Sequence, residues 1–530
     1  MPNLPARPNL DQLRRQARDL LRAARAGDAA ATKRIEAVSD RLSLAAAQLV
    51  VARDYEFSSW ARLKAEVDSR TADLAQKVEI FLEASIRDWT GRAARLLAAT
   101  PEIASYNFAT AVMLGDADRV REEIERDPAV ATRPDARSGW TPLHAVCGSR
   151  WHRPDPARAD GLVSVSRLLL DAGADLEARI GGPRGDRRGR TPLQCATATA
   201  STGAGNEPLL RLLLERGAVP EDHDLYMVGF AGNAHQCLRL LFDYTPDVAR
   251  TVETALSAPI SIGDIEGCRL LLEAGADPRR YVEDPPCPAV YAAVRSACSA
   301  ELVALLLAHG ADPEAPGPDG RSPYRLAIGR GRSDLAAVLR QAGARDDATD
   351  IDRFLSACLR ADHDDAQRQV ANHPGILDRL TDTAQGGAIV QAAEAGGTAA
   401  VGLMLDLGFP IEARGGDYGA TALHAAAYAG SAETVRFLLD RGADIEARDT
   451  TWDSTPLVWA TIGSGERPKH NPRPNWVATV RILIEAGASS EGVSLSSDDL
   501  KPPSPEVAQL LRAHGAGDHG AGAPLQTSTD

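Results

Sequence analysis

Residues 168–175 read Leu-Leu-Leu-Asp-Ala-Gly-Ala-Asp, and this stretch returns along the chain with small changes. Copies lie at residues 270–277, 305–312, 437–444 and, more loosely, 482–488. The interval between copies is nearly constant, since 35 residues separate Gly275 from Gly310 and 33 separate Gly310 from Gly343. A fixed period of this length indicates stacked units, each too small to bury its own apolar face alone.

A second phrase precedes the first within several units, and at residues 139–145 it reads Gly-Trp-Thr-Pro-Leu-His-Ala. Thr141 is suited to cap a helix with its hydroxyl, and Pro142 fits the first helical position, where a backbone N–H is not needed. Gly173 follows the second helix of the unit, where a left-handed residue is favoured. Each unit is therefore predicted to be a pair of helices. Related phrases begin at residues 189, 320, 419 and 454.

Together the two phrases resemble the ankyrin repeat, whose signature includes Thr-Pro-Leu-His-x-Ala over about 33 residues. The resemblance covers residues 78–516 and is most specific at 139–179 and 419–449. It implies an all-α fold, an ankyrin-type helix-pair solenoid with short extended fingers between the units. It also implies that His144 and His424, at the signature His position, bond the capping Thr and neighbouring backbone and belong to the scaffold.

Residues 1–70 differ from the repeats and are expected to form a small helical module, because their apolar residues follow helical spacing. The run from Leu44 to Trp60 resembles a module that precedes ankyrin arrays in some bacterial proteins. Its expected role is to cap the solenoid, whose first repeat otherwise exposes apolar surface.

Two ankyrin-like arrays are predicted after this module, at residues 78–347 and 351–516, and the second is expected to continue the first. The acidic stretch from Arg345 to Asp352 is either a joint between the arrays or a long finger. Residues 517–530 are rich in Gly, Ala, Ser and Thr and are predicted to be disordered.

The composition is ordinary for a soluble globular protein, with 44% hydrophobic and 25% charged residues. The formal net charge of −14 argues against a nucleic-acid partner held by a broad basic face, and against an anionic membrane surface. No stretch reads as a signal peptide or a membrane span. The seven cysteines lack zinc-ligand spacing and are expected to be reduced. These features predict a cytoplasmic protein with no cofactor and no metal.

The preferred function is a protein–protein interaction scaffold that binds a partner of unknown identity through the concave face and fingers of the solenoid. Aromatic and Arg side chains dominate such interfaces. Tyr418 and Tyr428 are expected to be exposed, and Trp452 is expected to join them in one patch, although Trp140 and Trp452 equally fit a role in stapling one finger to the next. The candidate partner-binding residues are Trp140, Arg330, Tyr418, Tyr428 and Trp452.

The alternative function is an enzyme or a small-ligand binder that uses the loops inserted near residues 150–160 and 463–476. Both loops combine Trp, His and Arg with Pro, and long loops in compact domains are often functional. No nucleophile motif, phosphate-binding loop or metal-ligand spacing accompanies them, so an enzyme is less favoured and no catalytic residue is assigned. The candidates in these loops are Trp151, His152, Arg153, His470 and Trp476.

Overall fold

The computed structural model describes the chain at residues 4–5, 8–39, 41–55, 57, 60, 63–64, 67, 72–87, 92–136, 138–152, 155, 157–180, 189–200, 206–229, 234–245, 248, 255–279, 287–416, 418–468, 471–490, 492–493, 495 and 503–514. The regular structure of these residues is helical, as expected. The predictions for Arg153, His470 and the tail at 517–530 fall outside the described residues.

Three helices form a module at the beginning of the chain. They are α1 (Leu10–Arg25), α2 (Ala29–Glu36) and α3 (Leu44–Asp54), and they begin at the polar caps Asn9, Asp28 and Ser43. Their apolar sides pack into a core of their own, which includes Leu13, Ile35, Val50 and Leu63. Residues 1–70 therefore contain a helical module with a separate core, and its role as a cap stays a prediction.

Pairs of helices follow the module, each with a first and a second helix. The earlier pairs are α5 (Leu74–Arg87) with α6 (Arg92–Ala99), α7 (Phe108–Leu114) with α8 (Ala117–Arg126), α9 (Pro142–Gly148) with α10 (Arg158–Asp171), α11 (Pro192–Ala200) with α12 (Glu207–Glu215), α13 (Asp222–Gly229) with α14 (His235–Tyr244), α16 (Ser257–Ile262) with α17 (Ile265–Glu273), α18 (Ala289–Arg295) with α19 (Ala300–Ala308), and α20 (Pro323–Gly329) with α21 (Ser333–Gln341). The later pairs are α22 (Asp350–Leu359) with α23 (His363–Asn372), α24 (Asp382–Glu394) with α25 (Thr398–Asp406), α26 (Ala422–Tyr428) with α27 (Ala432–Asp440), and α28 (Pro456–Glu466) with α29 (Trp476–Glu485), and α30 (Pro505–Ala513) comes after them. Short 3-10 helices are η1 (Pro101–Ile103), η2 (Pro128–Ala131) and η3 (Leu377–Arg379).

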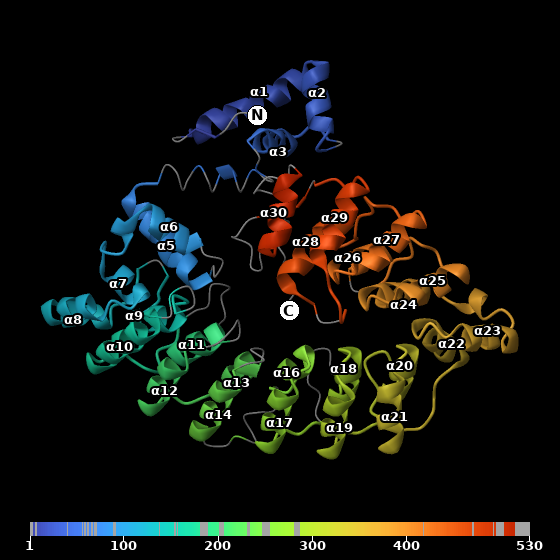
Figure 1. The fold of residues 1–530 in the computed structure, drawn as a ribbon. Helices are drawn as coiled ribbons and strands as arrows, with labels where there is room; N and C mark the ends of the chain where they lie inside the picture. Colours follow the sequence, from blue (N-terminus) through green and yellow to red (C-terminus); the bar gives the residue numbers. More distant parts are fainter. Residues whose placement is uncertain are drawn as a thin grey trace. The chain divides into compact units, whose positions relative to one another are not determined.

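The chain divides into two compact units, which we call the first unit (Val78–Ser356) and the second unit (Met1–Lys77 with Ala357–Asp530). The chain passes from one unit to the other within α5, after Lys77, and within α22, after Ser356. In the first unit the first helices pack side by side in chain order, from α7 on α9 to α18 on α20, and the second helices do the same, from α8 on α10 to α19 on α21 (Figure 1). In the second unit α26 packs between α24 and α28, and α27 packs between α25 and α29.

The helices begin and end where the repeat phrases predict. The Thr141 hydroxyl accepts a hydrogen bond from the backbone N–H of His144 at the start of α9. Gly173, Gly310 and Gly442 follow second helices with φ of 90°, 91° and 87°, so the predicted left-handed conformation is confirmed at all three. A side chain at these positions is strained, which explains why the phrase keeps Gly there.

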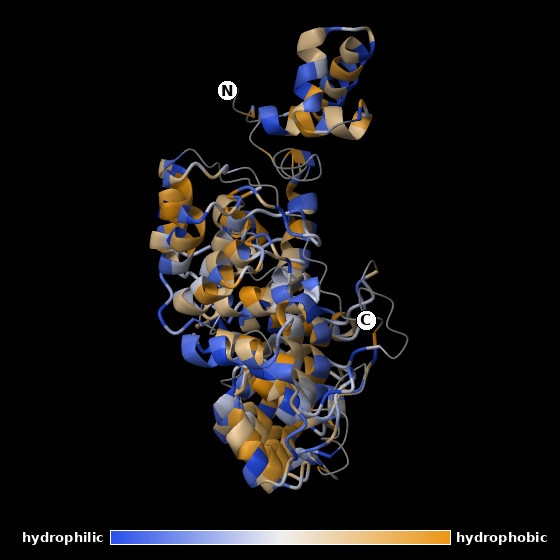
Figure 2. Ribbon diagram, turned by 90° about the vertical axis from the view of Figure 1, so that its right-hand side faces the viewer, coloured by the Kyte–Doolittle hydropathy of each residue, from blue (hydrophilic) through white to orange (hydrophobic). Residues whose placement is uncertain are grey.

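The core of the repeats is built from Leu, Ala and Val, and hydrophobic and hydrophilic residues alternate around most helices (Figure 2). All seven cysteines are buried and none forms a disulfide, as expected. Burial raises the pKa of the Cys195 thiol to about 12, which keeps it protonated and unreactive at neutral pH. Among the described residues, no helix is long and apolar enough to cross a membrane.

Candidate partner-binding site

Two neighbouring fingers in the second unit are closed by the same arrangement. In the finger before α26, Arg414 Nη1 donates to the carbonyl oxygen of Gly419 at 2.8 Å. In the finger before α28, Arg448 Nη1 donates to the carbonyl oxygen of Asp453 at 2.7 Å. Arg414 Nη1 also donates to the Arg448 carbonyl at 2.7 Å, so one guanidinium joins the two fingers. Each finger is thereby a fixed platform for the aromatic residues that it carries.

Four aromatic residues from these fingers and from α26 and α28 form what we call the aromatic cluster, which comprises Tyr418, Tyr428, Trp452 and Trp459. The Tyr418 and Trp452 rings lie with their centroids 4.3 Å apart at an interplanar angle of 33°. Trp459 lies beneath them, and its centroid is 6.1 Å from Tyr418 and 6.0 Å from Trp452. Tyr428 meets Trp459 edge-on, with centroids 5.8 Å apart.

The buried carboxylate of Asp449 holds the cluster in place. Its oxygens accept hydrogen bonds from the backbone N–H groups of Trp452 at 2.6 Å and Ser454 at 3.0 Å, and from the indole N–H of Trp459 at 3.0 Å. Asp449 is only 3% exposed, so these donors replace the water that the carboxylate has lost. One buried acid therefore fixes the finger tip and the ring beneath it.

Exposure differs sharply across the aromatic cluster. Tyr418 is 44% exposed, whereas Trp452, Trp459 and Tyr428 are half-buried. The Tyr428 hydroxyl donates to Glu466 Oε2 at 2.6 Å, and burial, followed by this bond to Glu466, raises the pKa of the phenol well above its usual range. The expectation of an exposed ring is therefore right for Tyr418 and wrong for Tyr428, because Glu466 of α28 and Trp459 enclose it.

The two signature histidines are scaffold residues, as the resemblance implies. His424 Nδ1 lies 2.8 Å from the Thr421 hydroxyl, and its Nε2 lies 3.0 Å from the Ser454 carbonyl oxygen. His144 bonds in the same way, to Thr141 and to the carbonyl oxygens of Ala178 and Arg190. A carbonyl oxygen only accepts, so Nε2 carries the proton in both rings. Burial lowers the pKa of both histidines and favours this neutral form.

The other two predicted partner-binding residues lie in the first unit and contact their own neighbours. The half-buried Trp140 ring packs against Gly148, where an added Cβ atom is 2.8 Å from it, and it meets the His144 ring edge-on. Arg330 Nη1 donates to the Arg295 carbonyl oxygen at 3.0 Å, which links the turn after α20 to the preceding repeat. For Trp140 and Arg330, the described contacts are those of repeat packing.

The inserted loops are anchored to earlier repeats by their tryptophans. Trp151 is buried, stacks near Phe81 and donates its indole N–H to the Ser85 hydroxyl at 2.9 Å. Trp476, the first residue of α29, covers Gly430 and donates its indole N–H to the Tyr428 carbonyl oxygen at 2.8 Å. Both are candidates for a ligand site, and in the structure the indole N–H of each is bonded within the fold. His152 is half-buried beside Trp151.

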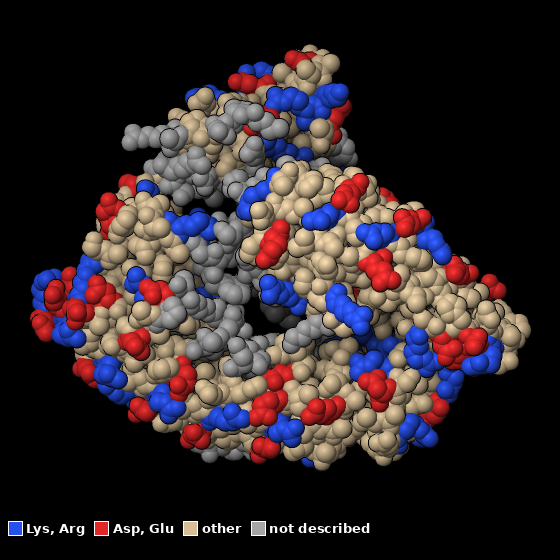
Figure 3. All heavy atoms as spheres, viewed as in Figure 1, with Lys and Arg blue, Asp and Glu red and all other residues tan. Residues whose placement is uncertain are grey.

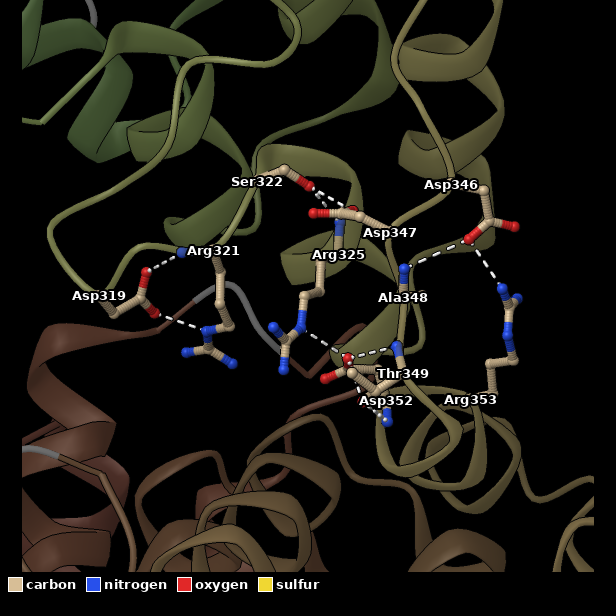
Figure 4. Close-up of polar contacts among 10 residues, drawn as sticks. All are labelled: Asp319, Arg321, Ser322, Arg325, Asp346, Asp347, Ala348, Thr349, Asp352 and Arg353. Carbon is tan, nitrogen blue, oxygen red and sulfur yellow. Dashed lines mark hydrogen bonds and ion pairs between the residues drawn. The ribbon is translucent and has the colours of Figure 1, made fainter. Parts of the chain in front are cut away.

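The acidic stretch from Arg345 to Asp352 is a finger tied to the repeat before it (Figure 4). Arg325 Nε donates to Asp352 Oδ2 at 2.7 Å, and the Ser322 hydroxyl donates to Asp347 at 2.7 Å. Asp352 is only 5% exposed, and it also accepts from the backbone N–H of Thr349 at 2.8 Å. Within the first unit, these charges pair with one another and stabilise the finger. Further pairs drawn in Figure 4 are Arg321 with Asp319 and Arg353 with Asp346.

Trp459 is the member of the aromatic cluster that the sequence analysis missed. It stands four residues after Thr455, at the variable position of the Thr-Pro-Leu-His-x-Ala phrase. Ala145 and Ala425 hold the equivalent position in their repeats. The signal that could have found Trp459 is a large aromatic residue at a position where two other repeats have Ala.

The described residues show no second candidate site in the form of a charged patch on the face drawn in Figure 3 or a metal-ligand cluster. In Figure 3, Lys and Arg are interspersed with Asp and Glu over the described part of the face shown. Within the described ranges, no group of three or more His, Cys, Asp and Glu residues is placed to hold a metal ion. The aromatic cluster is therefore the feature from which a function is argued.

Comparison with known proteins relates the repeats to a family. A family model of ankyrin repeats in three copies matches residues 355–449, and a model of a single ankyrin repeat matches residues 138–180. A solved structure, the crystal structure of the human ASB11 ankyrin repeat domain, aligns with 44% of this chain and 98% of that chain, at 18% identity and a TM-score of 0.22.

Two mouse proteins (Mus musculus) are similar in sequence. B-cell lymphoma 3 protein homolog is 28% identical over 270 residues, which are 48% of this chain, and the chain spans about half (53%) of that relative's length. Cyclin-dependent kinase 4 inhibitor B is 36% identical over 102 residues, which are 18% of this chain and 74% of that protein. With this likeness, and with the repeat signature, caps and paired helices described above, the chain belongs to the ankyrin-repeat family.

Proposed function

We propose that this chain binds a protein partner through the fingers and first helices around α26 and α28, with the aromatic cluster at the centre of the interface. The observation that carries the proposal is Tyr418, a large ring 44% exposed, stacked on Trp452 and supported from below by Trp459. An exposed tyrosine packed on a half-buried tryptophan gives a partner a large contact area with little loss of side-chain entropy. Trp140 and Arg330 are left out of the proposed interface because their described contacts serve packing.

The family supports a protein as the ligand. Ankyrin repeats are generally protein–protein interaction modules. The mouse relative named cyclin-dependent kinase 4 inhibitor B acts, by its name, on a protein. A cytoplasmic location is proposed because none of the seven cysteines forms a disulfide bond.

The test is a quantitative pull-down. The tagged chain captures partners from an extract of cells of its source, and the partners are identified by crosslinking and mass spectrometry. The Tyr418→Ala and Trp452→Ala variants are compared with Tyr244→Ala, because Tyr244 in α14 is a similarly exposed tyrosine (37%) in the other unit. A partner that binds the aromatic cluster is lost from the first two variants and kept by the third.

The expected loss of affinity is about 2 kcal/mol for either aromatic residue if it is a hot spot. Thermal melts of each variant separate this loss from unfolding. Partners captured equally by all three variants would show that the chain binds elsewhere, and the proposed interface would be abandoned.

A further inference from the structure

We infer that the partner presents a basic side chain, a lysine or an arginine, to the Tyr418–Trp452 pair and the neighbouring carboxylate of Asp453. This inference rests on the proposed function, since it specifies the chemistry of the partner at the same surface. Three features of the described residues carry it: the backbone at Asp453, the exposed aromatic pair, and the charge around them.

Asp453 occupies a backbone position that other fingers give to glycine. Its φ is 53°, and the equivalent residues Gly139, Gly320 and Gly419 have φ of 71°, 74° and 59°. A left-handed backbone is unfavourable for a residue with a Cβ atom, although Asp tolerates it better than most. Glycine therefore suits the turn better, and an aspartate at this position points to a use for its side chain.

The Asp453 carboxylate is exposed to solvent. Its side chain is 80% exposed, and it pairs with Arg448 at 3.3 Å. The same Arg448 nitrogen donates to the Asp453 carbonyl oxygen at 2.7 Å, a bond that closes the finger whichever side chain residue 453 carries. The carboxylate is thus not needed to hold the loop, and its exposure leaves room for a second cation.

The aromatic pair beside Asp453 attracts the same kind of group. The faces of Tyr and Trp rings carry negative charge density, so a cation over such a face is stabilised. Tyr418 is exposed next to Trp452, the residue that precedes Asp453 in the finger. Because Trp452 and Asp453 are consecutive in the finger, this tip presents both a ring and a carboxylate to an ammonium or guanidinium group.

Charge over a longer range favours the same partner. The chain carries a formal net charge of −14, which steers basic proteins towards it and repels acidic ones. The two arginines nearest the cluster, Arg414 and Arg448, each donate to carbonyl oxygens of the fingers. These bonds, and the ion pair of Arg448 with Asp453, engage both guanidinium groups within the fingers and leave them less available to an acidic partner.

The test measures binding of a short fluorescent peptide of alternating Arg and Gly to the full chain by anisotropy, with a Glu-Gly peptide as the opposite-charge probe. Tyr418→Leu keeps an apolar side chain but removes the ring, and Asp453→Gly removes the carboxylate but keeps the turn. Tyr244→Leu and Glu433→Gln are the matched controls, the latter removing one exposed charge on α27.

The Arg-Gly peptide is expected to bind about two- to fivefold more weakly to Tyr418→Leu and to Asp453→Gly, which is the effect of losing an exposed cation–π contact or ion pair. The two controls should bind like the wild type, and the Glu-Gly peptide should not bind. Equal binding of the Arg-Gly peptide to all variants, or no binding to the wild type, overturns the inference.

The same variants separate this inference from the proposed function. If the captured partner is lost from Tyr418→Ala but kept by Tyr418→Leu and Asp453→Gly, the interface is apolar, and only the basic partner is refuted. If Tyr418→Ala keeps the partner, the proposed interface itself fails. Competition supports the inference when the Arg-Gly peptide, and not the Glu-Gly peptide, displaces the captured partner.

Discussion

Tyr418 and Tyr428 share the aromatic cluster but differ in what surrounds them, so their substitution should have different effects on stability. Tyr418 is 44% exposed at the finger tip and loses mainly its contact with Trp452, so Tyr418→Ala should lower the free energy of unfolding by no more than about 1 kcal/mol. Tyr428 packs on Trp459 and bonds to Glu466, so Tyr428→Ala should cost about 2 kcal/mol. Urea unfolding of both variants measures the difference. Tyr428→Phe, which keeps the ring, should lie between them, and equal stability of the two Ala variants would contradict the packing described for Tyr428.

Asp224 provides a pH test at the residue scale. It is 1% exposed in α13, and burial raises the pKa of its carboxyl from 3.8 to about 6. The folded chain therefore binds this proton more tightly than the unfolded chain, so the contribution of Asp224 to stability falls as pH rises from about 4 to 6 and stays low above that. At about 1.4 kcal/mol per pKa unit, the full effect is on the order of 3 kcal/mol.

Asp224→Asn removes the titration with little change in shape. The Asn oxygen can still accept from the Glu221 backbone N–H, and the Asn amide can donate to the Thr197 hydroxyl, which itself donates to the Gln194 carbonyl oxygen. The melting temperature of the variant, relative to wild type, should therefore rise between pH 4 and pH 7. A difference that stays constant over this range would show that the carboxyl titrates normally.

At the scale of elements, the inserted loop before α29 acts as a clamp between neighbouring repeats. Trp476 lies against Gly430, where an added Cβ atom is 2.9 Å from the indole ring, and the backbone N–H of Asn475 donates to the Gly430 carbonyl oxygen at 2.8 Å. Gly430→Ala should therefore cost more than Gly442→Ala, although both positions are left-handed, because Gly442 has open space around it. Backbone strain of about 1–2 kcal/mol is common to both, and the clash adds about 1–3 kcal/mol at Gly430 alone.

Equilibrium unfolding of the two variants measures this difference, and a Trp476→Ala background gives the matched control. With the indole removed, the extra cost of Gly430→Ala should disappear, since the two residues are coupled by direct contact. If Gly430→Ala still lowers the free energy of unfolding more than Gly442→Ala in that background, the extra loss comes from the backbone, and the loop does not act as a clamp.

The fold was predictable because its signals are local and repeated. Thr141, Pro142 and Gly173 mark a helix start and a helix end wherever the phrase occurs, so the paired helices follow from the sequence. The site was only partly predictable. Tyr418 and Trp452 could be placed in fingers because each lies just before a copy of the repeat phrase. The environment of Tyr428 could not be predicted, because it depends on Glu466, which lies 38 residues away in the next repeat.

The contacts of the inserted loops could not be predicted, for a related reason. They carry no period, and Trp, His and Arg in an irregular loop look like a ligand site when the neighbouring repeat is not in view. Trp151 and Trp476 instead bond to groups 66 and 48 residues away. Only tertiary structure shows that these indoles face the fold.

Within the whole molecule, we propose that the fingers and first helices of the second unit form the binding surface and that the second helices and inserted loops support it. Hydrogen–deuterium exchange of the full chain, with and without its captured partner, tests this claim most directly. Protection on binding is predicted in the fingers at 413–420 and 447–454 and at the adjoining ends of α26 and α28. Protection confined to the inserted loop at 463–476 or to α25 and α27, with the fingers unchanged, would contradict it.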